Sequence, residues 1–380
     1  MKKLKKVVFV SNFFNHHQKP FSDAMYVNLG DGYRFIETEP MSEERKRMGW
    51  EVEGLPAYVI SSEQFKASPE GAIALIDQAD IVIFGSAPEH LLVSRKKAKK
   101  IIFRYSERPL KKGFELWKYP FRVVKWFLIN PPFKPVYMLS ASAYTASDYS
   151  KFGQYIGKCY KWGYFPQMKR YDIDVLINNK QENSILWVAR FIDWKHPEVA
   201  LEVAKRLKSD GYKFKLRMIG IGALESKMRA FIKDNDLFDC VEMLGVMNPE
   251  QVREHMEKSE IFLFTSDRNE GWGAVLNESM NSACAVVANQ AIGSVPFLIK
   301  DGENGYTYKD GDIDVLFNRV KLLLCDADNR KHIALNAYAT IINEWNAENA
   351  AEKLIALGEA ILNGNKKAML YDDGVCSKVK

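Results

Sequence analysis

Two acidic residues, Glu270 and Glu278, lie in a stretch of the chain whose pattern can do chemistry. The stretch starts at Ile261 and reads IFLFTSDRNEGWGAVLNE. The apolar run at its start has the length of a buried strand, the polar loop after it ends in Glu270, and a helix is predicted from Ala274. This spacing allows both carboxylates to face a ligand over the start of that helix, where free backbone amides favour anions.

The Glu-x7-Glu pattern resembles that of retaining nucleotide-sugar glycosyltransferases of the two-Rossmann (GT-B) fold, in particular glycosyltransferase family 4 (group 1). Two glutamates at this spacing also occur in ordinary helices, where one is solvated and the other lies near the helix start. The companions of the pattern along the chain therefore decide between the two interpretations.

Those companions fall in the family's order across residues 184–362. A predicted strand over 184–189 is followed by Arg190 and Lys195, which resemble the family's donor-phosphate motif. The remaining matches are Gly220-x-Gly222, Gly293-x-x-Pro296 and the turn-rich segment Asp301 to Gly305. Two positions depart from the pattern, because Ser294 replaces a second glycine and Phe297 replaces the usual glutamate.

The resemblance implies a role for each matching residue. Arg190 and Lys195 would neutralise the diphosphate, because negative charge builds on the leaving group as the glycosidic bond breaks. Glu270 would lie by the donor sugar, and Glu278 would hold the ribose hydroxyls. Arg190, Lys195 and Glu270 are thus the predicted catalytic residues. The donor-binding set adds Gly220, Gly222, Val246, Met247, Gly271, Trp272, Gly273, Ala274, Glu278, Gly293 and Ser294.

Short apolar runs alternate with helix-like segments along both halves of the 380 residues, which predicts parallel sheets covered by helices. A chain of this length favours two domains. We expect an α/β protein of the GT-B type, with two doubly wound Rossmann-like domains facing across a cleft. The expected parts are an acceptor-side domain (1–165), a linker (166–183), a donor-binding domain (184–346) and a C-terminal helix that crosses back within 347–380, followed by a frayed tail from residue 363.

The acceptor-side candidates in the first half follow predicted strands, where doubly wound folds bind ligands. The first such loop contains His16, His17 and Lys19 but lacks the Gly-Gly pair common in the family. The other candidates follow the strands 80–84 and 100–103; they are His90, Arg104 and Glu107.

Composition describes an ordinary globular protein, with 47% hydrophobic and 27% charged residues. The five cysteines are scattered without a C-x2-C pair, which argues against a zinc site and fits a reducing cytoplasm. The apolar run at 7–10 is too short for a signal peptide. Asp-x-Asp triplets lie in turn-like or helix-start positions, so we expect no metal and no other cofactor.

A basic segment stands out at residues 94–134, which hold thirteen Lys and Arg against two acids and interleave them with aromatic residues. Such a segment suits an anionic membrane surface, and a solvated basic face with buried aromatics is an equal alternative. No nucleic-acid recognition motif accompanies it, so nucleic acid is not an expected partner.

These observations predict a metal-independent, retaining hexosyltransferase that uses a nucleotide sugar, with UDP as the expected nucleotide. The acceptor would be a saccharide or a lipid-linked glycan in cell-surface or capsular polysaccharide biosynthesis, at the inner face of the plasma membrane. Front-face substitution and double displacement through Glu270 both remain open. The alternatives are an epimerase or phosphorylase on the same fold and a non-catalytic subunit that binds a glycan or lipid.

Overall fold

The structure is a computed structural model of the chain that describes all residues except 1, 48, 114–115, 132 and 380. The side chains of Glu44, Arg47 and Leu116 also lie outside the description. The chain divides into two compact units. Unit 1 comprises Met1–Gln167 and Asn346–Lys380, and unit 2 comprises Met168–Trp345. Each unit is an α/β layer structure around one parallel sheet.

The sheet of unit 1 has seven strands in the order β3-β2-β1-β4-β5-β6-β7, and every pairing is parallel. Its strands are apolar and fully covered at the centre, as expected where helices lie on both faces. They are β1 (Val7–Ser11), β2 (Tyr33–Glu37), β3 (Val59–Ile60), β4 (Ile81–Phe84), β5 (Ile101–Ser106), β6 (Val136–Ser140) and β7 (Cys159–Lys161).

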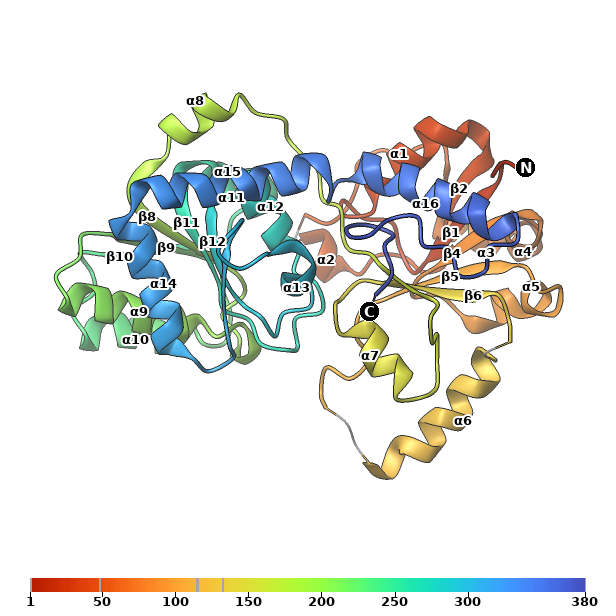
Figure 1. Ribbon diagram of the computed structural model, residues 1–380, viewed down its shortest axis with the longest axis horizontal. Helices are drawn as coiled ribbons and strands as arrows, with labels where there is room; N and C mark the ends of the chain where they lie inside the picture. Colours follow the sequence, from red (N-terminus) through yellow and green to blue (C-terminus); the bar gives the residue numbers. More distant parts are fainter. Residues whose placement is uncertain (1, 48, 114–115, 132, 380) are drawn as a thin grey trace. The chain divides into compact units, whose positions relative to one another are not determined.

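The helices of unit 1 connect these strands, except for the last helix, which comes from the far end of the chain. They are α1 (Lys19–Leu29), α2 (Glu43–Arg47), α3 (Ser62–Ala67), α4 (Pro69–Gln78), α5 (Val93–Lys97), α6 (Tyr119–Ile129), α7 (Thr145–Ser150) and α16 (Ala347–Leu362), with short 3-10 helices η1 (Gly30–Gly32), η2 (Glu89–Leu92) and η3 (Leu116–Lys118). Helix α16 lies beside α1 (Figure 1). The amide of Lys2 also donates to Asn363 Oδ1 at 2.8 Å, so both ends of the chain are held in this unit.

The sheet of unit 2 has six parallel strands in the order β10-β9-β8-β11-β12-β13. The strands are β8 (Gln181–Val188), β9 (Lys215–Ile219), β10 (Val241–Gly245), β11 (Ser259–Phe264), β12 (Ala285–Asn289) and β13 (Tyr306–Tyr308). The helices are α8 (Ile173–Asn178), α9 (Pro197–Ser209), α10 (Glu225–Asp234), α11 (Pro249–Lys258), α12 (Val275–Asn281), α13 (Val295–Leu298), α14 (Ile313–Cys325) and α15 (Ala327–Asn343), with the 3-10 turn η4 (Asp193–Lys195).

Both sheets reverse their winding direction at one point. In unit 1 the chain winds outward from β1 on one side and from β4 on the other, and in unit 2 the neighbours β8 and β11 mark the same reversal. Loops that leave neighbouring strands at such a point diverge to opposite faces and leave a crevice at the carboxyl edge of the sheet. The topology therefore assigns a ligand position to each unit before any side chain is considered.

Three expectations about local structure are wrong. Strand β5 runs on to Ser106 instead of ending at Phe103, so Arg104 lies inside the strand. The segment 166–183 is no plain linker, because it contains α8 and the start of β8, and Leu176 of α8 is buried against Ala283 and Ala334. These contacts were invisible in the sequence because they join residues more than a hundred positions apart.

The C-terminal tail is also ordered instead of frayed. The amide of Cys376 donates to Lys161 O at 2.9 Å, that of Lys161 to Ser377 O at 2.8 Å, and that of Val379 to Cys159 O at 3.1 Å. The tail thus pairs with the edge strand β7, and Val375 and Cys376 are buried. Such pairing satisfies the open hydrogen-bonding groups of a sheet edge, which explains why a polar segment is fixed here.

Candidate active site in the C-terminal unit

The loop after β8 carries the two predicted cations, Arg190 and Lys195, and it is held in place by a buried aromatic residue. Arg190 is exposed and makes no ion pair with any side chain that the structure describes. Phe191 next to it is fully buried and stacks on Trp187 with ring centroids 5.2 Å apart. This anchor fixes the backbone of the loop and leaves the Arg190 side chain in solvent.

Gly220 and Gly222 permit the loop after β9 to lie against the loop after β8. A Cβ atom at Gly220 would stand 1.9 Å from Ala189 O, and one at Gly222 would stand 2.3 Å from Phe191 O. The backbones are joined there, since Phe191 N donates to Ile221 O and Leu224 N donates to Phe191 O, both at 2.9 Å. The G-x-G segment is therefore explained by close backbone approach at the carboxyl edge of the sheet.

Lys195 and Glu270 form an ion pair between the loops after β8 and β11, the two strands at the reversal point. Both side chains are largely buried, and Ser266 Oγ donates to the same Glu270 oxygen at 3.1 Å. The Lys195 ammonium also lies 4.2 Å from the centroid of the Trp194 ring. Two predicted catalytic residues are thus in direct contact, which residue types and spacing did not indicate.

His196 is a site residue that the sequence analysis missed. Its Nδ1 lies 2.9 Å from Glu198 Oε1 and its Nε2 lies 3.4 Å from Asp267 Oδ2, so the ring joins the start of α9 to the loop after β11. The residue has a left-handed backbone, with φ of 50°, at the N-cap of α9. The only feature of the sequence that could have identified His196 as a site residue is its position directly after Lys195. Its two carboxylate partners, Glu198 and Asp267, come from separate segments of the chain.

The hydrogen bond with Glu198, opposed by burial and supported by Asp267, raises the pKa of His196. Since the folded protein holds this proton more tightly than the unfolded chain, the stabilisation is complete below the ordinary value of 6.5 and is lost as pH rises through the folded-state pKa. We expect the unfolding free energy of the wild type to fall across this window relative to His196→Asn, which keeps a residue tolerant of the left-handed backbone but cannot titrate. Urea unfolding at several pH values measures this difference, and parallel curves for both proteins would contradict it.

Around Glu270, the next loops are packed closely. Gly273 has φ of 78°, and a Cβ there would meet the Phe264 ring at 2.3 Å. Gly293 N donates to Glu270 O at 3.2 Å, and Ser294 Oγ donates to Trp272 O at 2.5 Å. The Gly271–Ala274 segment and the loop of Gly293 and Ser294 therefore lie side by side next to the Lys195–Glu270 pair.

The Trp272 ring does not reach a ligand position. It is fully buried, donates from Nε1 to Asn277 Oδ1 at 2.9 Å, and lies 5.7 Å from the Trp345 ring. Phe297, which stands where the family pattern has glutamate, stacks on Trp345 at 6.0 Å. The phenylalanine that replaces the family's glutamate therefore packs in an aromatic cluster with Trp272 and Trp345.

Glu278 lies on α12, partly buried, and its carboxylate accepts no hydrogen bond from the residues that the structure describes. Burial raises its pKa, and the nearby Arg253 opposes that rise. Arg253 itself donates to the backbone oxygen of Glu278 at 3.0 Å and to Asn281 Oδ1 at 3.1 Å. Among the described residues, the carboxylate is therefore open to a donor such as a hydroxyl group.

Val246 and Met247 lie farther along the same edge, after β10, which is two strands away from β8. Gly220 N donates to Gly245 O at 2.7 Å and connects the two loops. Val246 is 71% exposed. The predicted donor residues thus form one continuous row of loops at the carboxyl edge of the sheet of unit 2, from β10 to β12.

In unit 1, three of the six acceptor-side candidates share one neighbourhood. The His17 ring stacks on Tyr164 at 6.2 Å, and Tyr164 Oη donates to Glu107 Oε1 at 2.6 Å. Burial lowers the pKa of His16 and, with help from His16, lowers that of His17 to about 3. Both rings are therefore neutral at physiological pH, so neither supplies a positive charge to a phosphate group. Tyr164 was missed by the sequence analysis.

The other three candidates are Lys19, His90 and Arg104. Lys19 begins α1 and pairs with Asp23 at 2.6 Å. His90 is exposed on η2. Arg104 is buried in β5, where it pairs with Glu89 and donates to Asn130 Oδ1 at 3.1 Å, so its charge is used within the fold.

No group of three or more His, Cys, Asp or Glu side chains is placed to hold a metal ion within the described part of the chain. None of the helices described is both long enough and apolar enough to cross a membrane.

The two doubly wound units define the GT-B class of α/β proteins. HepE of Anabaena, solved in complex with UDP, has this fold: it aligns with a TM-score of 0.67 at 13% identity, over 93% of this chain and 100% of that one. Residues 169–340 match the sequence model of the family described as glycosyl transferases group 1. The matched segment lies within unit 2 and agrees with the family resemblance described from the sequence.

Two curated relatives each match less than half of the chain. The amylovoran biosynthesis glycosyltransferase AmsK of Erwinia amylovora is 30% identical over 182 residues, 47% of this chain and 44% of the relative. An N-acetylgalactosamine-N,N'-diacetylbacillosaminyl-diphospho-undecaprenol 4-alpha-N-acetylgalactosaminyltransferase of Campylobacter jejuni is 32% identical over 151 residues, 40% of each chain. The alignments thus span less than half the length of these relatives.

Proposed function

We propose that the protein is a retaining glycosyltransferase that moves a hexose-type sugar from a nucleoside-diphosphate sugar to a saccharide or lipid-linked acceptor. One observation carries the proposal: Arg190, Lys195 and Glu270 are brought to the reversal point of the sheet in the domain that matches the family. UDP is the proposed nucleotide, as in the complex of HepE, and polysaccharide assembly is the proposed setting, as in the name of AmsK.

In the proposed reaction, the bond between the sugar C1 and the diphosphate oxygen breaks, and the acceptor hydroxyl oxygen bonds to C1. The acceptor proton passes to a leaving phosphate oxygen. Arg190 and Lys195 would stabilise the charge that develops on the diphosphate, because fixed cations act most strongly where charge appears in the transition state. The open carboxylate of Glu278 would accept hydrogen bonds from the ribose hydroxyls.

The ion pair with Lys195 and the hydrogen bond from Ser266 support front-face substitution over double displacement. A carboxylate nucleophile must attack C1 with an available electron pair. The Glu270 oxygen that the structure places toward Lys195 is shared between two donors. We therefore assign Glu270 the task of orienting Lys195 and the donor sugar.

The test is nucleotide release by the full chain across a panel of nucleotide sugars, with and without EDTA and with a saccharide acceptor. We expect one donor to be turned over in an acceptor-dependent reaction that EDTA leaves unchanged. Turnover without an acceptor would favour an epimerase or phosphorylase, and loss with EDTA would contradict metal independence. No turnover, together with no thermal shift from any nucleotide, would overturn the proposal in favour of a non-catalytic subunit.

A further inference from the structure

Helix α6 lies at the periphery of unit 1 and packs on it through one side (Figure 1). The Trp126 ring meets Tyr149 edge-on at 5.0 Å, and Tyr119 lies 6.2 Å from Phe152. At the end of the helix, the buried Asn130 donates to Tyr155 Oη at 2.7 Å. These contacts fix the rotation of the helix about its axis.

The opposite side of α6 is apolar and faces solvent. Residues three, four and seven positions apart share one face of a helix, so Phe121, Val124 and Leu128 lie on the same side. Their exposed fractions are 73%, 59% and 74%, and no residue of this helix is buried. In an ordinary surface helix the apolar stripe faces the core. Exposed apolar patches of this kind mark sites of interaction.

Exposed aromatic side chains also flank the helix at both ends. Trp117 is 70% exposed just before α6, and Phe133 is 72% exposed just after it. Phe114 and Glu115, which also belong to the segment 94–134, lie outside the described residues. Tryptophan and phenylalanine at the ends of an amphipathic helix are suited to the headgroup level of a bilayer.

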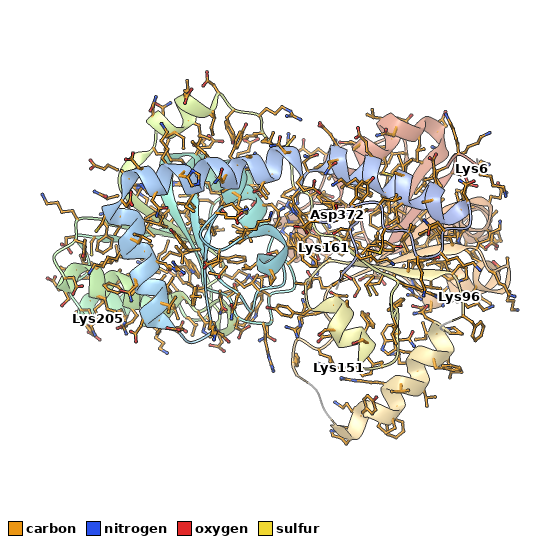
Figure 2. All side chains as sticks on the ribbon, in the orientation of Figure 1. Lys6, Lys96, Lys151, Lys161, Lys205 and Asp372 are labelled. Atoms are coloured by element: carbon orange, nitrogen blue, oxygen red, sulfur yellow. The ribbon has the colours of Figure 1, made fainter. Side chains whose placement is uncertain are left out.

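Not every cation of the segment 94–134 is available for binding. Arg95 is fully buried and donates to the carbonyl oxygens of Ile76, Ala79, Asp80 and Ile101. Lys96 pairs with Glu89 at 3.0 Å and donates to Ile129 O at 2.8 Å, and Figure 2 labels it close to the end of α6. These two cations hold the fold together, a division that the sequence did not reveal.

Lysines from other parts of the chain lie near the end of α6. Lys158 Nζ donates to Lys134 O at 2.9 Å, and Lys378 Nζ donates to Gly157 O, so three distant segments meet after α6. Burial and the nearby Lys366 lower the pKa of Lys158, and burial lowers that of Lys378, with Lys367 adding to the effect. Ile156, two residues before Lys158, is 73% exposed.

We propose that the exposed face of α6, with Trp117 and Phe133 at its ends and the lysine cluster of Lys134, Lys158, Lys366, Lys367 and Lys378 beside it, binds an anionic lipid bilayer. Apolar side chains enter the acyl boundary, while the cations meet the headgroups. A symmetric contact with a second copy is disfavoured, because the same patch on both subunits would bring like charges together. The proposal goes beyond the transferase function and is tested without any donor.

The experiment is flotation of the full chain with vesicles of phosphatidylcholine alone and with vesicles that also contain phosphatidylglycerol. We expect binding to the anionic vesicles, weakened by salt, and a loss of roughly tenfold or more in Phe121→Ser/Leu128→Ser. Lys366→Glu/Lys367→Glu should also weaken binding, by roughly thirtyfold if each of the two lost cations contributes about 1 kcal/mol.

Matched controls are Phe238→Ser/Leu322→Ser and Lys205→Glu/Lys213→Glu, which remove comparable groups from unit 2 and should bind as the wild type does. Thermal unfolding checks that each variant is folded. Absence of binding to anionic vesicles by the wild type would overturn the proposal, as would equal binding by all variants. Concentration-dependent dimerisation in analytical ultracentrifugation that Phe121→Ser/Leu128→Ser abolishes would overturn it in favour of a self-association surface.

Discussion

Arg190→Ala is expected to lower kcat/KM for donor turnover by roughly two to three orders of magnitude, the usual effect of removing one preorganised group that stabilises transition-state charge. The guanidinium is exposed and has no ion-pair partner among the described residues, so its removal should leave stability within about 0.5 kcal/mol of the wild type. Steady-state kinetics and urea unfolding of the same preparation measure both quantities.

Two further variants sharpen this result. Arg229→Ala removes another exposed arginine of the same unit, whose described partner is Glu225 on the same helix, and should leave turnover unchanged. Arg190→Lys should recover part of the loss, because a lysine supplies the charge but not the forked geometry for two phosphate oxygens. A loss of less than about tenfold in Arg190→Ala would contradict the assigned role, since one such donor normally contributes more.

Lys195→Met is expected to affect both stability and catalysis. It removes the cation from a largely buried pair and leaves Ser266 as the remaining described donor to the Glu270 carboxylate. Breaking a buried pair from one side is costly, so we expect a loss of about 2 to 4 kcal/mol in unfolding free energy. Turnover should fall by roughly two to three orders of magnitude as well.

The double variant Lys195→Met/Glu270→Gln separates the two effects. Without the carboxylate there is no unpaired buried charge, so we expect most of the lost stability to return while turnover stays low. Glu270→Gln alone should also be less stable than the double variant, because it leaves the ammonium of Lys195 without its carboxylate. Additive losses of stability in the double variant would show that the two side chains do not depend on each other.

Several helices and strands could be predicted from the sequence, because their apolar patterns depend only on residues close together in the chain. The C-terminal helix expected within 347–380, ahead of the tail from residue 363, is α16 (Ala347–Leu362). The strand cores of β1, β4 and β11 were also predicted, because continuous apolar runs are typical of strands covered on both faces.

The sequence by itself also determined which loops carry the candidate chemistry, since the predicted motifs follow predicted strands. It placed Arg190 and Lys195 after one strand and Glu270 after another. It could not determine that Lys195 and Glu270 are paired, that His196 joins two loops, or that Tyr164 connects His17 to Glu107. Each of these contacts joins residues from separate loops, and their geometry depends on strand order and on the packing beneath the loops.

Only the tertiary structure shows which cations of the basic segment are buried and paired, and which side of α6 faces solvent. Lys and Arg look alike in a sequence, but Arg95 and Arg104 are buried and have partners, whereas Lys366 and Lys367 come from a tail that was expected to be frayed. Amphipathic periodicity shows that α6 has an apolar side, and it cannot show which side the core covers. The outward rotation of that helix follows from the contacts of Trp126 and Tyr119, which the folded chain supplies from α7 and the turn after it.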